Sequence, residues 1–455
     1  MVKALLFLLK VSLVVAAAVW LSAQPGQLEI LWRGYLIETS AGFAVAVLLG
    51  FLGVYTLLYR IWRAFVSVPD SLRRYHAIRT REHGYEDVTA GFLAVAAGDK
   101  KMARRLADRA THRVPDAPLA RLLSAQAAQL EGDAARARRI FTDLLDDKSS
   151  AFFGLRGLLQ DSLAVGDYDG ALSYIRKADG LQPKRGWIVK TLFDLETRNR
   201  SWSAAEAALK RGARLGVFSK EDVARHRQAL LLARADDAFQ SGDVVAAHKQ
   251  AAKALDINPA FTPAAGRLAR FYLHAGKRKA AIKTLLRGFA AHPHADLTAA
   301  WMRLQPETAK TVSVYDEGRA AYQWARRLYD ACPGHSAGLS MLGVAAVGAR
   351  QFSEARTLLT QAADYRALAA LERAEHNDEA KARQWLEAAN DAPPAPLWVC
   401  GCCGFAALDW SPLCRHCGVF NASKWDAPVH GHTVADAGEA GANAVPPLAL
   451  PMRQM

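Results

Sequence analysis

The sequence predicts an all-α protein in which a helical repeat array follows membrane-spanning helices. Three observations support this prediction. Two long apolar stretches lie near the amino terminus, a pattern recurs every 34 residues through the middle of the chain, and the composition favours helix. Alanine, leucine and arginine are strong helix formers and are abundant, whereas aromatic residues make up only 9% of the chain.

The two apolar stretches are each long enough to cross a bilayer. Ala4 to Ala23 is interrupted only by Lys10 and two serines, and Ala41 to Tyr59 contains no charged residue. About 20 helical residues span the hydrocarbon core. A cleaved signal peptide, with Met1 to Lys3 as its charged start, is the alternative for the first stretch. We expect residues 1–63 to form two transmembrane helices joined by a short periplasmic loop.

Charged residues around the second stretch predict its orientation. The loop before it holds Arg33 against Glu29 and Glu38, whereas six arginines follow it: Arg60, Arg63, Arg73, Arg74, Arg79 and Arg81. Because positive charge is retained on the cytoplasmic side, the chain beyond residue 60 is expected in the cytoplasm. The net charge of +14 agrees with a nearby anionic membrane surface, and an ordinary soluble basic surface is the alternative interpretation. A nucleic-acid partner is not expected, since the basic residues follow the membrane exit.

Residues 64–396 carry a repeat of 34 residues. A turn position recurs in a frame with two short insertions, at Gly98, Gly132, Gly166, Arg200, Gly242, Gly276, Asp316 and Arg350. Five residues further along, all eight positions are alanine: Ala103, Ala137, Ala171, Ala205, Ala247, Ala281, Ala321 and Ala355. Seventeen residues further along, five positions are proline: Pro115, Pro183, Pro259, Pro293 and Pro333. A shortened ninth unit around Asn377 closes the array.

These columns are typical of a tetratricopeptide repeat. The turn residue connects two helices, the alanine lets them approach closely, and the proline ends the second helix. One helix pair cannot bury its own apolar face, so eight to nine units are expected to stack into a solenoid with a concave groove.

Such grooves bind peptides and other proteins, and three cations are candidates for contacting them. Arg156 and Lys190 occupy equivalent positions on successive first helices, and Arg270 lies one helical turn further along on a later unit. These side chains are suited to a partner's carboxylates. Ordinary solvated charges are the alternative interpretation.

Residues 397–426 contain a metal-binding pattern. Cys400, Cys403, Cys414 and Cys417 form two C-x2-C pairs separated by ten residues. This spacing predicts a zinc-ribbon or rubredoxin-like module with a structural zinc ion, and iron is the alternative metal. Cys402 and His416 lie inside the knuckles and are expected not to bind the metal, and the alternative is that Cys402 competes with Cys403 as a ligand. We expect the aromatic residues of the segment to pack around the module: Trp398, Phe405, Trp410, Phe420 and Trp425.

No catalytic constellation is recognisable, so the sequence predicts a protein that is not an enzyme. Phosphate-binding loops, dinucleotide-binding fingerprints, serine-hydrolase elbows and zinc-protease motifs are all missing from the sequence. Residues 427–455 are rich in alanine, glycine and proline without periodicity, and we expect them to be disordered.

The order of these parts resembles the proteobacterial HemY family of inner-membrane tetratricopeptide proteins. The ending WVCGCCG…DWSPLCRHCGVF is similar to the zinc knuckle of some members, although Arg415 stands where proline often follows the third cysteine. The resemblance implies a multi-pass protein of the bacterial inner membrane linked to haem biosynthesis. A second family, the one-span lipopolysaccharide-assembly proteins with a rubredoxin-like ending, is also similar.

Three functional hypotheses follow. The first is a non-catalytic membrane scaffold that captures late haem-pathway enzymes, as the HemY resemblance implies. The second is a scaffold that regulates envelope lipid or lipopolysaccharide assembly. The third is a porphyrin-handling or redox protein that uses the cysteine cluster directly, which requires iron or haem in the purified protein.

Overall fold

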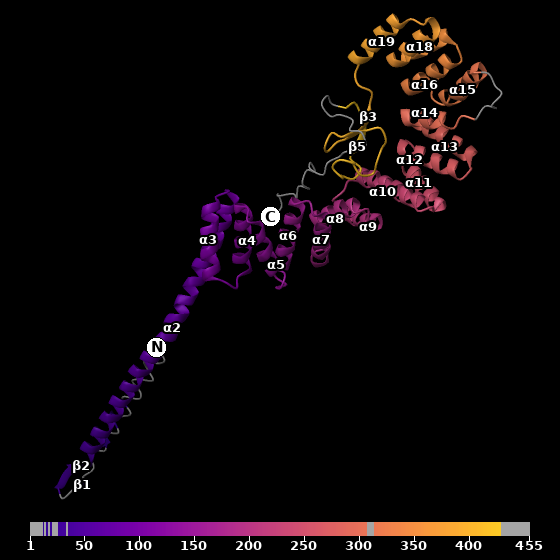
Figure 1. The fold of residues 1–455 in the computed structure, drawn as a ribbon. Coiled ribbons are helices and arrows are strands. Elements are labelled where there is room, and N and C mark those ends of the chain that lie inside the picture. The colour runs from indigo at the N-terminus through magenta and orange to yellow at the C-terminus, as the bar shows by residue number, and fades with distance from the viewer. Residues whose placement is uncertain are drawn as a thin grey trace. The chain divides into compact units, whose positions relative to one another are not determined.

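The structure, a computed structural model, describes residues 26–32, 35–306 and 314–428, together with five positions between residues 12 and 20. The chain divides into two compact units, Met1–Gly132 and Asp133–Met455. The predicted helical class is confirmed, with two small sheets in addition (Figure 1). The predicted disordered tail lies outside the described residues from residue 429 onward.

The first unit begins with a hairpin where the sequence predicted a short loop. Strands β1 (Gln27–Trp32) and β2 (Tyr35–Ser40) pair antiparallel, with Gln27 opposite Ser40 and Trp32 opposite Tyr35. The segments QLEILW and YLIETS are rich in β-branched and aromatic residues and are separated by two residues that include a glycine. These features are typical of a β-hairpin, so the prediction of a loop without strands was wrong.

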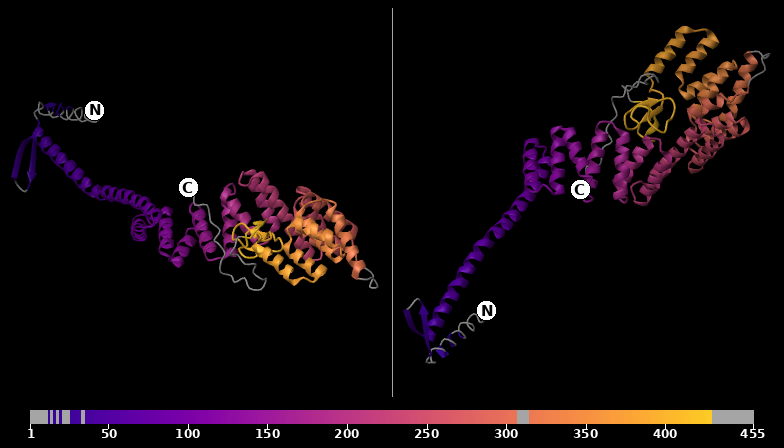
Figure 2. Two further views of the ribbon diagram at one scale, coloured as in Figure 1. Left: turned by 90° about the horizontal axis from the view of Figure 1, so that it is seen from above. Right: turned by 60° about the horizontal axis from the view of Figure 1, so that its bottom comes forward.

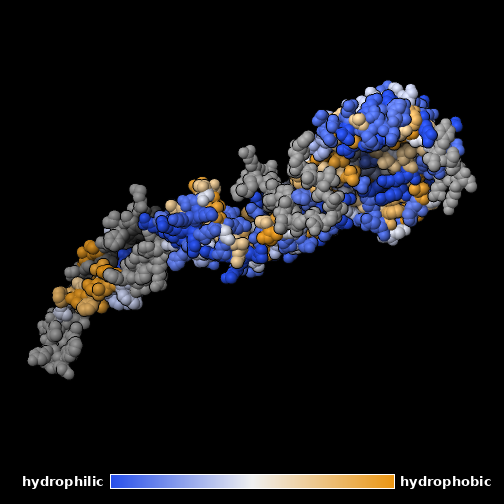
Figure 3. All heavy atoms as spheres, turned by 45° about the horizontal axis from the view of Figure 1, so that its top comes forward, coloured by the Kyte–Doolittle hydropathy of each residue, from blue (hydrophilic) through white to orange (hydrophobic). Residues whose placement is uncertain are grey.

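Helix α2 (Ala41–Ala96) is 56 residues long and starts at Ser40, whose side chain accepts a hydrogen bond from the amide of Phe43. Its segment Gly42–Arg63 has a mean hydropathy of 2.0 and is 0% buried, so it is apolar without being a core helix. Figure 3 shows these hydrophobic side chains exposed on the surface. This segment confirms that the second predicted span is a helix suited to a membrane.

The first predicted span, Ala4 to Ala23, lies outside the described residues apart from the five positions mentioned above. The described part of the chain therefore offers one membrane helix, and it does not support the predicted multi-pass topology. The predicted boundary at residue 63 falls inside α2. The membrane segment thus continues without a break into the first helix of the repeat array.

The part of the first unit that follows the apolar segment is a three-helix core. Helices α3 (Lys100–Arg113) and α4 (Pro118–Glu131) pack on the end of α2 around Val88, Leu106 and Leu123. Gly91 of α2 makes this packing possible, because a Cβ atom there would lie 2.3 Å from the Leu123 side chain. The absence of a side chain lets the two helices touch.

The second unit is a run of stacked helices. Its helices are α5 (Ala134–Asp143), α6 (Ala151–Ala164), α7 (Tyr168–Leu181), α8 (Gly186–Arg198), α9 (Trp202–Arg214), α10 (Lys220–Gln240), α11 (Val244–Ile257), α12 (Thr262–His274), α13 (Arg278–Ala291), α14 (Ala295–Met302), α15 (Val314–Tyr329), α16 (Ser336–Gly348), α17 (Phe352–Ala362), α18 (Tyr365–His376) and α19 (Glu379–Asp391). From α6 onward they pack as consecutive pairs, each pair also touching the next. This is the predicted solenoid.

Most positions of the predicted turn and alanine columns have the expected conformation and burial. Seven of the eight turn positions have a positive φ, and Arg200 and Arg350 adopt it at 57° and 55° although they are not glycine. The ninth-unit residue Asn377 does so too, at 52°. Seven of the eight alanines are at most 2% exposed: Ala103, Ala137, Ala171, Ala205, Ala247, Ala281 and Ala355.

The frame was wrong in one unit. Asp316 lies inside helix α15 rather than in a turn, and the fully buried alanine of that helix is Ala325, not Ala321. The buried position is therefore displaced by about one helical turn. The insertion preceding this unit has no periodicity of its own, so sequence spacing alone could not place it.

The cysteine module follows α19 as a three-stranded antiparallel sheet. Strand β3 (Leu397–Cys400) lies between β4 (Ala406–Ala407) and β5 (Ser423–Asp426). Leu397 pairs with Asp426, and Trp398 pairs with both Ala407 and Trp425. In Figures 1 and 2 this module, drawn in yellow, lies against the helices around α10 and α12 rather than apart from them.

Candidate metal centre

The structure brings the four predicted ligands to one point. The sulfur atoms of Cys400, Cys403, Cys414 and Cys417 all lie within 4.8 Å of one another. Two of these separations, Cys400 to Cys417 and Cys403 to Cys414, are 3.7 Å. A zinc ion with sulfur ligands at about 2.3 Å in a tetrahedron requires sulfur–sulfur separations of about 3.8 Å. The donor set and its spacing therefore fit a tetrahedral metal ion.

Backbone amides around the cluster point at the sulfurs. Against the effect of burial, the amides of Cys402 and Cys403 lower the pKa of the Cys400 thiol, and those of Phe405 and Val419 act in the same direction on the pKa values of Cys403 and Cys417. Gly404 and Gly418 make these turns possible with φ values of 74° and 69°. Hydrogen bonds of this kind stabilise thiolates, which are the form that binds metal.

Burial acts on the cysteine thiols in the opposite direction. Burial raises the pKa of Cys403 to about 11, against the amide of Phe405. Burial also raises the pKa of Cys417, where the neighbouring thiols of Cys403, Cys414 and Cys400 add to the effect. Four thiolates at this spacing repel one another unless a cation lies between them, so deprotonation of the cluster and metal binding are coupled.

The remaining cysteines lie outside this cluster. Cys402, the predicted competitor of Cys403, is exposed, and Cys332 belongs to the helical array. The ring of His416 stacks on Phe405 at 6.0 Å instead of entering the sulfur cluster.

One side of the module rests on an aromatic cluster of the solenoid. The ring of Phe420 lies 5.8 Å from Phe193, 6.1 Å from Trp202 and 5.9 Å from His226. Next to it, Arg198 donates a hydrogen bond of 2.9 Å to the carbonyl oxygen of the ligand Cys417.

A second contact joins the module to α10 and α12. The guanidinium of Arg267 pairs with Asp236 at 2.8 Å and donates to the carbonyl oxygen of Trp410 at 3.0 Å. The Trp410 ring also meets Phe261 edge-on at 5.4 Å. A single arginine therefore bridges the helices and the module.

The third contact is at the start of α14. The indole nitrogen of Trp398 donates to Asp296 at 2.9 Å, and its ring stacks on His294. Trp425 lies 4.1 Å from the same histidine. The three contacts together seat the module on the first helices of four successive pairs, α8, α10, α12 and α14.

This arrangement corrects the prediction that the aromatic residues pack around the module. Trp398, Trp410 and Phe420 belong to the hydrophobic core of the solenoid, and only Phe405 packs with the cysteines. A module of about 30 residues is too small to bury five large aromatic side chains by itself. Their number was the sequence signal for docking against another surface.

Two histidines in this contact are held neutral. Burial, with repulsion from Arg225, lowers the pKa of His226 to about 4. Burial, with repulsion from His292 and His335, lowers the pKa of His294 to about 4 as well. Charging either ring would place an unpaired cation among the aromatic side chains of the interface.

The predicted partner-binding cations lie in two separate places. Arg156 on α6 lies over the ring of Trp187 at 5.6 Å, and Lys190 on α8 is exposed. One turn after Lys190, burial raises the pKa of Asp194 to about 6, against the charge of that lysine. Arg270 instead lines a cavity between the helices and the module.

Sequence reasoning missed the other residues of this cavity. Arg267, Arg303 and Asp236 come from three different helices, and Asp409 and Arg415 come from the module. No spacing relates these five positions, so only the docking of the module brings them together.

Comparisons with known proteins agree with this architecture. The family model described as HemY protein N-terminus matches residues 26–132, which end where the first compact unit ends. A tetratricopeptide-repeat model matches residues 238–302. A probable magnetosome protein Mms48 of Magnetospirillum gryphiswaldense is 24% identical over 442 residues, which cover 94% of each chain.

Solved structures of repeat proteins are similar at lower levels. A tetratricopeptide-repeat protein from Parabacteroides merdae is 15% identical with a TM-score of 0.28, covering 59% of this chain and 99% of its own. MamA is 18% identical with a TM-score of 0.24, covering 36% and 92%. At these scores the likenesses carry no argument about function. The matched amino-terminal region, the repeats and the four clustered cysteines together identify the chain as a HemY-like tetratricopeptide-repeat protein.

Proposed function

We propose that the protein is a non-catalytic scaffold of the bacterial inner membrane that binds other proteins through its cytoplasmic repeat array. The observation that carries this proposal is the continuity of α2, which joins an exposed apolar segment directly to the helices α3 and α4 of the first unit. This helix would tether the chain that follows it to the membrane. Catalysis of a haem-pathway step by the purified protein would contradict the non-catalytic part of the proposal.

The proposed protein-binding surface is the patch around Arg156 and Lys190. Phe153 is 42% exposed beside Phe152 and Trp187, whose rings pack edge-on at 6.1 Å. Aromatic side chains next to cations suit a partner segment that carries both apolar and acidic residues.

The metal of the module is proposed to be zinc in a structural role. Four sulfur ligands leave no open position for a substrate, and the module's contacts are with the solenoid. Zinc would hold the module folded so that it can pack on the helices. An iron-containing preparation with rubredoxin-like absorption would overturn this assignment.

The proposed clients are late haem-pathway enzymes. The support for this step is the name of the matched family region, since the fold by itself is shared by many repeat proteins. Regulation of envelope lipid or lipopolysaccharide assembly is the second candidate. It is favoured by one observation, a cysteine module that follows a repeat array along the chain, which the one-span proteins that the sequence resembles also combine.

Affinity purification from gently solubilised membranes, followed by mass spectrometry, tests the proposal. Recovery of enzymes that act on coproporphyrinogen or protoporphyrin, or of ferrochelatase, would support the haem assignment. Recovery of envelope-lipid enzymes or a membrane protease would replace it with the second candidate.

A matched pair of variants makes this experiment specific. Replacing Arg156 and Lys190 by glutamate should remove the clients, because the charge of the patch is reversed. Replacing Lys177 and Arg214, which are exposed on the second helices α7 and α9, by glutamate should leave them bound. Equal recovery with both variants would contradict a role for the patch.

A further inference from the structure

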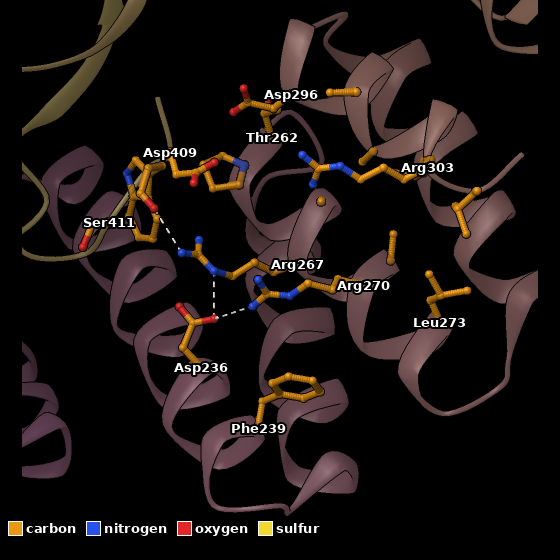
Figure 4. A pocket seen from close by; sticks show the side chains of 18 of the residues that line it. Asp236, Phe239, Thr262, Arg267, Arg270, Leu273, Asp296, Arg303, Asp409 and Ser411 are labelled. Atoms are coloured by element: carbon orange, nitrogen blue, oxygen red, sulfur yellow. Dashed lines mark hydrogen bonds and ion pairs between the residues drawn. The ribbon is translucent and has the colours of Figure 1, made fainter. Parts of the chain in front are cut away.

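A cavity of about 560 Å³ lies between the cysteine module and helices α10, α12 and α14. Its size is within the range of ligand-binding sites. Figure 4 shows Arg267, Arg270 and Arg303 extending into the same space, with Asp409 and Ser411 of the module on the opposite side. The cavity is therefore built by two parts of the chain that are far apart in sequence.

The charged side chains that line the cavity differ in how strongly they are already paired. Arg267 is engaged by Asp236 and Trp410, and the carboxylate of Asp296 accepts the indole hydrogen bond of Trp398. Arg270 lies 3.9 Å from Asp236 and 5.6 Å from the ring centres of Phe239 and Phe271, and its side chain is 61% exposed.

Two further guanidinium groups remain available to a ligand. Arg303 and Arg415 are exposed, and their guanidinium groups form no ion pair or hydrogen bond with the residues that the structure describes. Asp296 and Asp409 are the carboxylates that remain beside the Arg267–Asp236 pair, so the guanidinium groups of Arg270, Arg303 and Arg415 outnumber them by one within the described lining. The cavity consequently attracts an anion, and guanidinium groups favour carboxylates in particular.

The remaining lining contains apolar residues beside the polar Gln240, Thr262 and Ser411. Leu273, Leu285 and Leu304 line the cavity together with Ala269, Ala299 and Ala300. Leu273 is 42% exposed, which leaves apolar surface open to a ligand. Stacking of a nucleic-acid base is disfavoured, because the ring of Phe239 is already stacked on Phe271 at 4.6 Å and Trp410 meets Phe261.

We propose that this cavity binds a short acidic segment of a partner protein. An apolar side chain of the segment contacts the exposed Leu273, while its carboxylates pair with Arg270, Arg303 and Arg415. This inference rests on the proposed scaffold function and assigns a ligand class to one site of it. Because Arg415 and Trp410 belong to the module, the site is complete only while the metal holds the module in place.

The test uses the full-length protein in nanodiscs of zwitterionic lipid and a fluorescein-labelled peptide of alternating glutamate and leucine, six residues long. Fluorescence anisotropy should show saturable binding that weakens with added salt. The same peptide with glutamine in place of glutamate should bind at least about tenfold more weakly. Equal affinity of the two peptides would overturn the proposal.

Variants locate the site. Arg303→Ala and Arg415→Ala should each weaken binding of the acidic peptide by about fivefold. Arg287→Ala, an exposed arginine of α13 outside the cavity, should bind like the unchanged protein. Unchanged affinity in both cavity variants would overturn the site. Amidation of the peptide's carboxyl end distinguishes the sources of charge: weaker binding assigns a contact to the terminal carboxylate, and unchanged binding assigns it to the side chains.

Metal removal tests the composite nature of the site. A Cys414→Ser, Cys417→Ser variant should lose peptide binding together with the metal, and unchanged binding by this variant would overturn the module's part in the site. Failure of the peptide to bind, with clients still captured through Arg156 and Lys190, would overturn this inference and leave the scaffold function standing. If neither the unchanged protein nor any variant captured clients, the scaffold function itself would be overturned.

Discussion

Arg198 donates a hydrogen bond to the carbonyl oxygen of Cys417, a predicted metal ligand 219 positions further along the chain. The same guanidinium lies over the ring of Tyr168 at 3.7 Å, which fixes its direction. Gly418 completes the contact, because a Cβ atom there would lie 2.7 Å from the arginine. The metal centre is thus held by the helical array as well as by its own ligands.

Replacing Arg198 by alanine should loosen the module without unfolding the solenoid. A hydrogen bond from a charged group contributes about 2 kcal/mol, and its loss leaves the Cys417 carbonyl without this donor. Hydrogen exchange measured by mass spectrometry should show faster exchange in residues 397–426 and little change in the helices. Arg214→Ala, an exposed change on α9, serves as the control. Equal exchange in the two variants would show that the contact does not hold the module.

Replacing Cys400 and Cys403 by serine should abolish metal binding, because two of the four ligands are lost. Elemental analysis should fall from one zinc ion per chain to none, while circular dichroism retains the helical signal. Cys402→Ser should keep its metal, since Cys402 is exposed and outside the sulfur cluster. Loss of metal from the Cys402 variant would mean that the ligand set has been assigned incorrectly.

Docking of the module should weaken as the pH falls from about 6.5 toward 4. The pKa values of His226 and His294 are lowered to about 4 by burial in the docked state, whereas freely solvated histidine titrates near 6.5. In this window the undocked state binds protons that the docked state does not, so stability increases with pH. Below about pH 4 both states are protonated and this contribution is fully lost.

Tryptophan fluorescence from Trp398, Trp410 and Trp425 can follow this transition. His226→Phe should shift its midpoint to lower pH, because one titrating group is removed from the interface. The zinc content must be measured in the same samples, since acid also protonates thiolates. An unchanged midpoint in the variant would show that His226 does not control docking.

Replacing Arg350 by glycine should stabilise the protein by about 0.5 to 1 kcal/mol. Arg350 has a φ of 55°, a left-handed conformation that glycine adopts at no steric cost. Thermal unfolding followed by circular dichroism would measure the gain. The reciprocal change, Gly276→Arg, introduces a side chain at a φ of 70° and should destabilise the protein by a similar amount. A lower melting temperature for Arg350→Gly would contradict the strain argument.

Several features were predictable because they depend on residues close together in the chain. The 34-residue frame identified the left-handed turns at Gly242, Arg200 and Arg350, since each turn is formed by its own neighbours. The apolar run before Arg63 and the two C-x2-C pairs were also predictable from the sequence, because the length of a membrane-spanning helix and the spacing of ligands are local properties. The hairpin at Gln27 to Ser40 carried a local signal too, and could have been found.

The tertiary structure alone decided where the module lies and what it encloses. Trp398 reaches Asp296 across 102 positions, and Arg267 reaches Trp410 across 143. Such pairs follow no period, because they depend on how many stacked helices separate the two surfaces and on which aromatic faces each leaves uncovered. The spacing of residues along the sequence therefore predicts the repeat and the metal ligands. The docked module and its arginine-lined cavity arise instead from packing between distant segments.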